Sequence, residues 1–104
     1  MVYPRHPRTA AALPALTRST ERTYLAKLAS ELAPYGVWAR VVEDGVPFLR
    51  VSNPKSEYAI EDVSCERRSY DYAFLTTFGV CLGSSDSLPL AARRTAWLVG
   101  ATPA

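Results

Sequence analysis

The sequence predicts an α+β fold, in which a four-stranded antiparallel meander sheet carries an N-terminal and a C-terminal helix packed mainly on one face. Apolar residues recur at helical spacing near both ends of the chain, whereas the middle holds stretches rich in β-branched and aromatic residues. Strand and helix patterns do not alternate, and no segment repeats, so a parallel βαβ sheet is not expected. At 104 residues, the chain has room for one such core.

Residues 1–17 are predicted to be a flexible basic arm, and residues 18–104 a single α+β domain. The arm combines prolines with scattered arginines and shows no apolar periodicity, so it cannot bury enough surface to offset the entropy of ordering it. The first helix should begin after Ser19, a favourable N-cap, and should end at Pro34 and Gly36. Its apolar stripe is Leu25, Leu28, Ala29 and Leu32.

Two stretches rich in β-branched residues, 37–43 and 46–52, flank Asp44-Gly45 and predict a β-hairpin with a two-residue turn. That turn sets the cross-strand pairs Val42 with Pro47, Arg40 with Leu49 and Trp38 with Val51 on one face, and Val41 with Phe48 and Ala39 with Arg50 on the other. Both faces would then be substantially apolar. Because helices would cover one face alone, something else is expected to cover the second.

The chain from residue 57 onward predicts two more strands and the last helix. Residues 57–65 alternate as a third strand. Residues 70–82 are the most apolar segment and suit one long fourth strand, in which Gly79 marks a bulge. Pro89 suits a first helical turn and Gly100 a helix end. The stripe of this last helix is Leu88, Ala91, Ala92, Thr95 and Leu98.

Composition and charge limit which partners and which cellular compartment we expect for this protein. The net charge is only +2, and the basic excess lies in residues 1–27, so the rest of the chain lacks the basic surface of a duplex-binding protein. No apolar run approaches the roughly 20 residues that span a bilayer, so a membrane is not an expected partner. Cys65 and Cys81 are too few for a disulfide framework and lack the spacing of a zinc or redox site, which favours the cytoplasm.

The sequence shows no set of residues with an evident catalytic or cofactor-binding role. The single histidine, His6, lies in the predicted arm, so no folded histidine can activate a cysteine as a nucleophile. Glu61 and Asp62 are adjacent and would point to opposite faces of a strand. No glycine-rich segment has the Lys-Ser/Thr ending of a phosphate-binding loop. We therefore predict no catalytic residue, metal site or cofactor, and favour a non-enzymatic protein while the enzyme question stays open.

Aromatic and arginine side chains on the predicted strands are the candidate ligand or interface residues: Trp38, Arg40, Arg50, Tyr58 and Tyr72. Rings and guanidinium groups on a sheet can line a pocket for an anion or an aromatic ligand. The same residue types are also buried between the subunits of homodimers. A second set has the chemistry to contact phosphates or an acidic partner, or to form ordinary solvated surface: Arg67, Arg68, Arg93 and Arg94.

The apolar pattern of the predicted domain also resembles a known group of proteins. The segments that carry the likeness are Leu32, Gly36-Val37, residues 39–42, 47–51, 72–75 and 90–92. Over about residues 20–100, the chain is similar to the small α-β-β-β-β-α proteins, mostly uncharacterised, of GC-rich actinobacteria. The resemblance implies that fold and an actinobacterial context. Because the matching positions are core positions, it implies no reaction and no functional residue.

The function that these observations favour is a small homodimeric regulatory or adaptor protein, acting through protein–protein interaction at the outer sheet face or at an edge strand. One alternative is a cofactor-independent small-molecule-binding protein or enzyme of specialised metabolism. A second alternative is contact with nucleic acid through the arginine-rich arm, although nucleic acid is not the expected partner.

Overall fold

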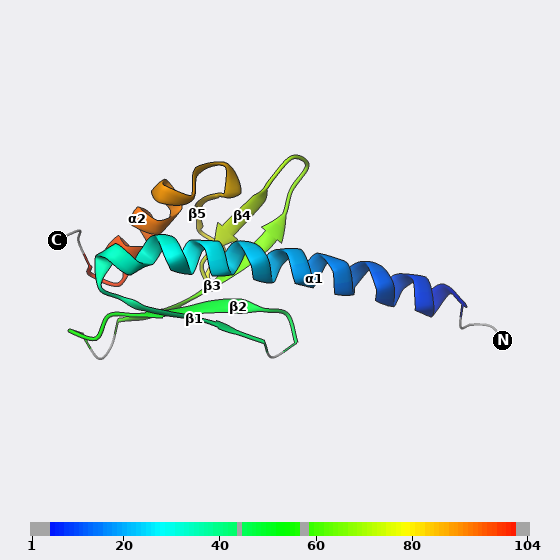
Figure 1. Cartoon of the computed structure of the whole chain (residues 1–104), viewed down its shortest axis with the longest axis horizontal. Coiled ribbons are helices and arrows are strands. Elements are labelled where there is room, and N and C mark those ends of the chain that lie inside the picture. The colour runs from blue at the N-terminus through cyan, green and yellow to red at the C-terminus, as the bar shows by residue number, and fades with distance from the viewer. Residues whose placement is uncertain (1–4, 44, 57–58, 102–104) are drawn as a thin grey trace.

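The computed structural model of the chain confirms an α+β fold with an antiparallel meander sheet (Figure 1). It describes residues 5–43, 45–56 and 59–101, with side chains from residue 18 onward. Helix α1 (Arg5–Leu32) leads into a sheet with the strand order β1-β2-β3-β4-β5, and α2 (Leu88–Leu98) follows the sheet. The strands are β1 (Trp38–Val42), β2 (Phe48–Ser52), β3 (Ile60–Arg67), β4 (Tyr72–Leu75) and β5 (Cys81–Ser84).

Within the described residues the sheet has five strands where the sequence predicted four, because the predicted strand at residues 70–82 is two strands joined by a tight turn. In this turn, the Thr76 N–H donates to the Val80 carbonyl and the Gly79 N–H donates to the Thr76 carbonyl, both at 2.9 Å. Gly79 has a φ of 83°, which glycine adopts readily, so it reverses the chain instead of marking a bulge. The irregular step lies between β4 and β5, where Phe74 pairs with Gly83 and Leu75 with Cys81.

Helix α1 begins at Arg5, not after Ser19 as predicted. The alanines at positions 10–12 favour helix, and Pro7 lies in the first turn, where its missing N–H costs no helical hydrogen bond. Ser19 is an interior residue of α1, and its carbonyl accepts a bond from the Thr23 hydroxyl at 3.0 Å. The flexibility of residues 1–17 and the division of the chain at residue 18 stay predictions, and residues 1–4 lie outside the described part.

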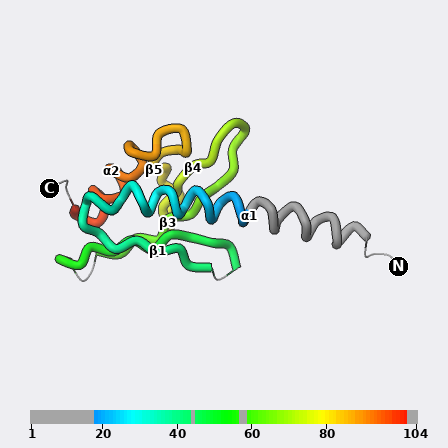
Figure 2. Tube along the Cα trace, viewed as in Figure 1, coloured from blue at the N-terminus to red at the C-terminus, as the bar shows by residue number. Residues whose placement is uncertain are grey.

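Both helices contribute to one core on a single face of the sheet, which we call the inner face. The predicted stripe of α1 is confirmed, since Leu25, Leu28 and Leu32 are fully buried. Helix α2 lies beside α1 (Figure 2). Its Leu98 is exposed, whereas Ala96, and Val99 just after the helix, extend the buried stripe. The sheet contributes Leu49, Val51, Val63, Cys65, Phe74 and Leu82 to this core.

The β1–β2 register differs by one residue from the predicted one. Strand β1 ends at Val42 and β2 begins at Phe48, because Pro47 has no N–H to donate to the ladder. The observed pairs are Trp38 with Ser52, Ala39 with Val51, Arg40 with Arg50, Val41 with Leu49 and Val42 with Phe48. A shift of one residue exchanges the two faces of a strand. The apolar pairs of Ala39 and Val41 therefore face the helices, and the outer face is mixed instead of substantially apolar.

Candidate functional site

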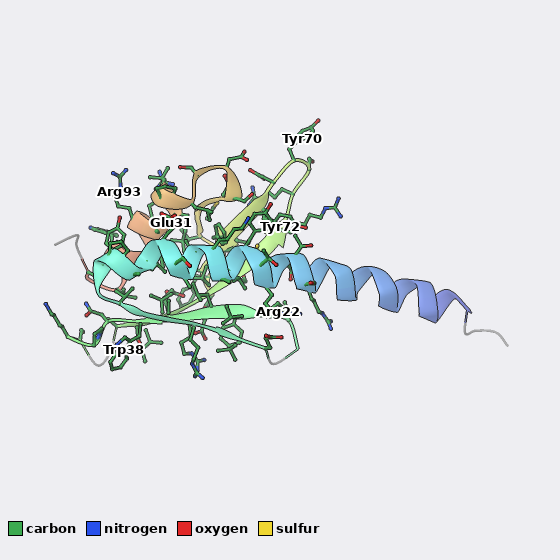
Figure 3. The ribbon with its side chains drawn as sticks, viewed as in Figure 1. Arg22, Glu31, Trp38, Tyr70, Tyr72 and Arg93 are labelled. Atoms are coloured by element: carbon green, nitrogen blue, oxygen red, sulfur yellow. The ribbon has the colours of Figure 1, made fainter. Side chains whose placement is uncertain are left out.

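Three of the five candidate strand residues gather at the β1 edge of the sheet. Trp38, Arg40 and Arg50 lie on the outer face, which Figure 3 shows for Trp38 on the side away from α1. They border a hollow of about 600 Å³, which we call the β1 edge hollow. Its remaining lining residues come from the end of α1, from the short segment between α1 and β1, and from β1 and β2: Ala29, Ala33, Val37, Ala39 and Ser52. Because residues of both faces line it, the hollow follows the free edge of the strand.

The other two candidate residues are not brought to this hollow. Tyr72 is on the inner side of the sheet, where its ring stacks on that of Tyr24 with centroids 4.9 Å apart and planes at 30°. The Lys27 ammonium lies 5.1 Å from the centroid of the Tyr24 ring. Tyr72 thus joins α1 to the sheet by aromatic packing. Tyr58 lies outside the described residues.

Arg50 is held by a bidentate ion pair on the outer face. Its Nε donates to Asp62 Oδ1 at 2.9 Å and its Nη2 donates to Asp62 Oδ2 at 3.0 Å. These hydrogen bonds, and then the charge of Asp62, raise the pKa of Arg50. Its guanidinium also lies 5.4 Å from the centroid of the Phe48 ring. Because its charge and two of its donors are already engaged by Asp62, Arg50 is a poor anchor for an external anion.

Arg40 differs from Arg50, although the two residues are direct cross-strand partners. Within the described residues, Arg40 forms no ion pair, and it is exposed. The row across β1, β2 and β3 is therefore Arg40, Arg50 and Asp62, with one positive charge in excess. Trp38 precedes Arg40 by two residues on the same face and is 68% exposed. The β1 edge hollow thus presents an exposed indole beside an uncompensated guanidinium.

The backbone at the β1 edge is also available for pairing. The Asn53 N–H donates to the Ala59 carbonyl at 3.0 Å, so residues 49, 51 and 53 direct their backbone groups toward β3. Phe48, Arg50 and Ser52 then direct theirs toward β1, where they meet the alternate residues of that strand. The N–H and C=O groups of Ala39 and Val41 consequently point outward, to the side where no described strand neighbours β1.

The four arginines of the second candidate set lie in two separate places. Arg67 ends β3, and the Arg68 N–H donates to the Asp71 carbonyl at 2.7 Å in the following hairpin loop. Arg93 and Arg94 lie on α2, and Figure 3 shows Arg93 well apart from Tyr70, a residue of the hairpin loop. None of the four forms an ion pair with another described residue. The structure therefore presents two exposed arginine pairs instead of one phosphate-binding cluster.

A buried carboxyl group near a buried thiol was not identified from the sequence. Glu21 lies on α1 with 9% of its surface exposed, and its Oε1 finds no hydrogen-bond partner among the described residues. Burial raises the pKa of Glu21, and the charge of Arg18 opposes that shift. Burial, and then the charge of Glu21, raises the pKa of Cys65 to about 12. The Cys65 thiol therefore stays protonated at neutral pH and is a poor nucleophile. The signal in the sequence was the position of Glu21, four residues before Leu25 on the buried stripe.

The described residues offer neither a metal site nor a membrane span. In residues 5–43, 45–56 and 59–101, no three His, Cys, Asp or Glu side chains form a group that could hold a metal ion. Neither described helix combines the length and the apolar character needed to cross a membrane. No protein-family model, curated protein or solved structure matches the chain. The resemblance to small actinobacterial proteins therefore stays a prediction.

Proposed function

We propose that this protein is a homodimeric, non-enzymatic adaptor or regulatory protein of the cytoplasm, and that two copies join through their β1 edges. The observation that carries the proposal is the outward direction of the Ala39 and Val41 backbone groups on a strand with regular pairing along its length. Natural proteins usually protect such an edge with a proline, a bulge or a covering element. Trp38–Val42 contains no proline, and its ladder to β2 has no register shift. Two antiparallel β1 strands would complete a continuous sheet.

The side chains of β1 select one register for this pairing. A two-fold axis at Arg40 would place two guanidinium groups directly opposite each other, which is destabilising. An axis at Val41 would leave Trp38 beyond the end of the partner's strand. An axis at Ala39 instead places Trp38 opposite the partner's Arg40, in a pair whose side chains lie close together because its backbone groups point away. The exposed indole and the uncompensated guanidinium would then form a cation–π contact twice per dimer.

The inner side of the β1 edge can accommodate the second copy in this register. Ala39 would pair with the partner's Ala39, and Val37 with the partner's Val41. Ala29 in the last turn of α1 and Ala33 just after it line the hollow, and these small side chains leave space beside the edge. Val41 and Ala39 are only partly buried in one chain, so pairing would bury further apolar surface.

The experiment measures the subunit number first and the register second. Native mass spectrometry of the parent chain should show a dimer, and Trp38→Asp should shift it to monomer. In a Cys81→Ser background, Ala39→Cys should form a disulfide across the axis, because paired Cα atoms about 5.5 Å apart suit that bond. Val46→Cys is the matched control, because two copies of this exposed loop residue would lie more than about 20 Å apart. A monomeric parent, or cross-linking equal at positions 39 and 46, would contradict the proposal.

A second candidate function is the binding of a small planar anion in the same hollow. The volume of about 600 Å³ falls within the range of ligand pockets. Trp38 would stack on a ring and Arg40 would pair with a carboxylate. The same native spectrum separates the two candidates, since a retained ligand adds a constant mass of a few hundred daltons to the protein. A dimer without added mass favours the adaptor, and a monomer with added mass favours the binding protein.

A further inference from the structure

The opposite edge of the sheet carries a second exposed apolar surface. Val80, Trp97 and Leu98 are 59%, 73% and 42% exposed, and Phe78 at the neighbouring turn is 89% exposed. The first three border a hollow of about 340 Å³ between β5 and α2, which we call the α2–β5 hollow, and its other lining residues are Cys81, Leu82 and Arg94. Large apolar side chains clustered in this way usually mark an interaction site.

The backbone at this edge does not suit the addition of a strand. Strand β5 is four residues long, and its pairing with β4 shifts register between Phe74 and Leu75. Gly83 lies so close to α2 that a Cβ atom there would be 2.9 Å from Ala91 Cβ. Helix α2 therefore packs directly on the strand and leaves a space lined by side chains. An occupant must be recognised by its side chains, as an amphipathic helix in a groove is.

The charge around the α2–β5 hollow is positive. Arg93 and Arg94 are exposed, and neither forms an ion pair with another described residue. Neither α2 nor β5 contains an acidic residue. Glu61 reaches the neighbouring turn, where its Oε2 accepts bonds from the Thr77 amide and hydroxyl, each at 3.3 Å. Asp86, in the short segment between β5 and α2, precedes the first turn of α2, whereas Arg94, Trp97 and Leu98 lie in its last five residues. The residues that line the hollow thus include one guanidinium group, that of Arg94, and no carboxylate.

We propose that the α2–β5 hollow binds an acidic amphipathic helix from another protein. The apolar face of that helix would pack on Val80, Trp97 and Leu98, and one of its carboxylates would pair with Arg94, which lines the hollow. This inference goes beyond the dimer proposed above, because it assigns a partner surface to the opposite edge of the sheet. Since β1 and β5 are separated by three strands, both edges can be occupied together, and a dimer would be bivalent for its partner.

The test uses the full chain and two designed peptides. Each fluorescently labelled peptide has about 18 residues with leucine at helical spacing, and the other positions are glutamate in one and lysine in the other. Fluorescence anisotropy should show that the glutamate peptide binds at least about tenfold more tightly than the lysine peptide. Arg94→Glu should reverse that preference. Equal binding of both peptides, or no binding of the glutamate peptide, would overturn the proposal.

Two variants of exposed aromatic residues, Trp97→Ala and Tyr70→Ala, test where the peptide binds. They also test the other possible occupant of the hollow, which is a second copy of this chain. Trp97→Ala should weaken binding of the glutamate peptide at least about tenfold, whereas Tyr70→Ala, in the hairpin loop after β3, should leave it unchanged. Both residues are mostly exposed, so circular dichroism should show an intact fold in each variant. If Trp97→Ala instead converts a dimer to a monomer, the α2–β5 hollow is a self-interface and the proposal is wrong. A monomeric parent that still binds the glutamate peptide at Trp97 would reject the β1 dimer and retain this site.

Discussion

The two edges of the sheet offer different means of recognition, although both lie beside a helix and both expose a tryptophan. At β1 the ladder is regular, and the N–H and C=O groups of Ala39 and Val41 point outward. At β5 the strand is short, its register shifts, and α2 packs directly on Gly83. The first edge therefore suits backbone pairing, and the second suits the packing of side chains. Whether an edge is open thus depends on the regularity of its ladder as well as on its position in the sheet.

The largest effect should come from Ala39→Pro, which removes an outward N–H at the centre of the proposed interface. Proline is tolerated on an edge strand when its missing N–H faces away from the sheet, so each chain should still fold. Dimer affinity should fall at least about a thousandfold, because each copy loses a buried hydrogen bond and gains a ring at the axis. Light scattering across a dilution series measures this, with Ala39→Ser as the control that keeps the N–H. A proline variant that dimerises as the serine variant does would remove β1 from the interface.

Gly83→Val tests the opposite edge. The added side chain would meet Ala91 at a φ of 152°, so the variant should lose about 2–4 kcal/mol of unfolding free energy. Urea denaturation measures the loss. Where the variant is still folded, binding of the glutamate peptide should fall because α2 moves away from β5, while the dimer persists. If folded Gly83→Val protein loses both dimerisation and peptide binding, the two edges are not independent.

Arg40→Glu should have a smaller effect on the β1 edge. The substitution replaces the cation that would lie over the partner's Trp38, so dimer affinity should fall about tenfold. Arg40→Lys should recover part of the loss, since it keeps the charge. Sedimentation equilibrium at low and high salt measures both variants. An unchanged dissociation constant for Arg40→Glu would contradict the axis at Ala39 while leaving other registers open.

Substitution of Glu21, a buried residue of α1 that belongs to neither sheet edge, should give the smallest effect. Burial raises the pKa of Glu21 above its ordinary value of 4.5, so the folded chain binds this proton more tightly than the unfolded chain. The resulting stabilisation is complete below pH 4.5 and is lost as the pH rises through the folded pKa. Glu21→Gln should remove this pH dependence of the unfolding free energy. Urea denaturation measures the unfolding free energy between pH 4 and pH 8, about the range in which a raised carboxyl pKa titrates. Parallel pH profiles of variant and parent would contradict the assignment of this pH dependence to Glu21.

Local sequence patterns predicted those elements that local chemistry determines. Leu25, Leu28 and Leu32 share one face of a helix because of their spacing, and Gly36 ends the helical segment with a φ of 72°. The register of the hairpin was predicted incorrectly because Asp44-Gly45 is a strong turn signal, whereas the missing N–H of Pro47 is what excludes it from the ladder. The fifth strand was missed because the turn at Thr76–Val80 is held by hydrogen bonds of its own backbone and of one threonine hydroxyl.

The candidate site was predictable only within one hairpin. Trp38 and Arg40 are two residues apart on one strand, and Arg50 lies opposite Arg40, so their common face follows from pairing in the observed register. The face of Tyr72 depends on the lengths of the loops that precede it, which residue types do not determine, and it lies under α1. The exposed surface of Val80 and Trp97 could not be anticipated, because it arises where two segments distant in the sequence pack together.

Amide hydrogen exchange, followed residue by residue by NMR, tests the central claim most directly. In the parent chain, the amides of Ala39 and Val41 should exchange slowly, because in the dimer they donate to the partner's strand. In Trp38→Asp, which should be monomeric, the same two amides should exchange rapidly, while the Arg40 amide, bonded to β2, should stay protected. Rapid exchange of Ala39 and Val41 in a parent protein shown to be dimeric would contradict pairing through β1 and place the interface elsewhere.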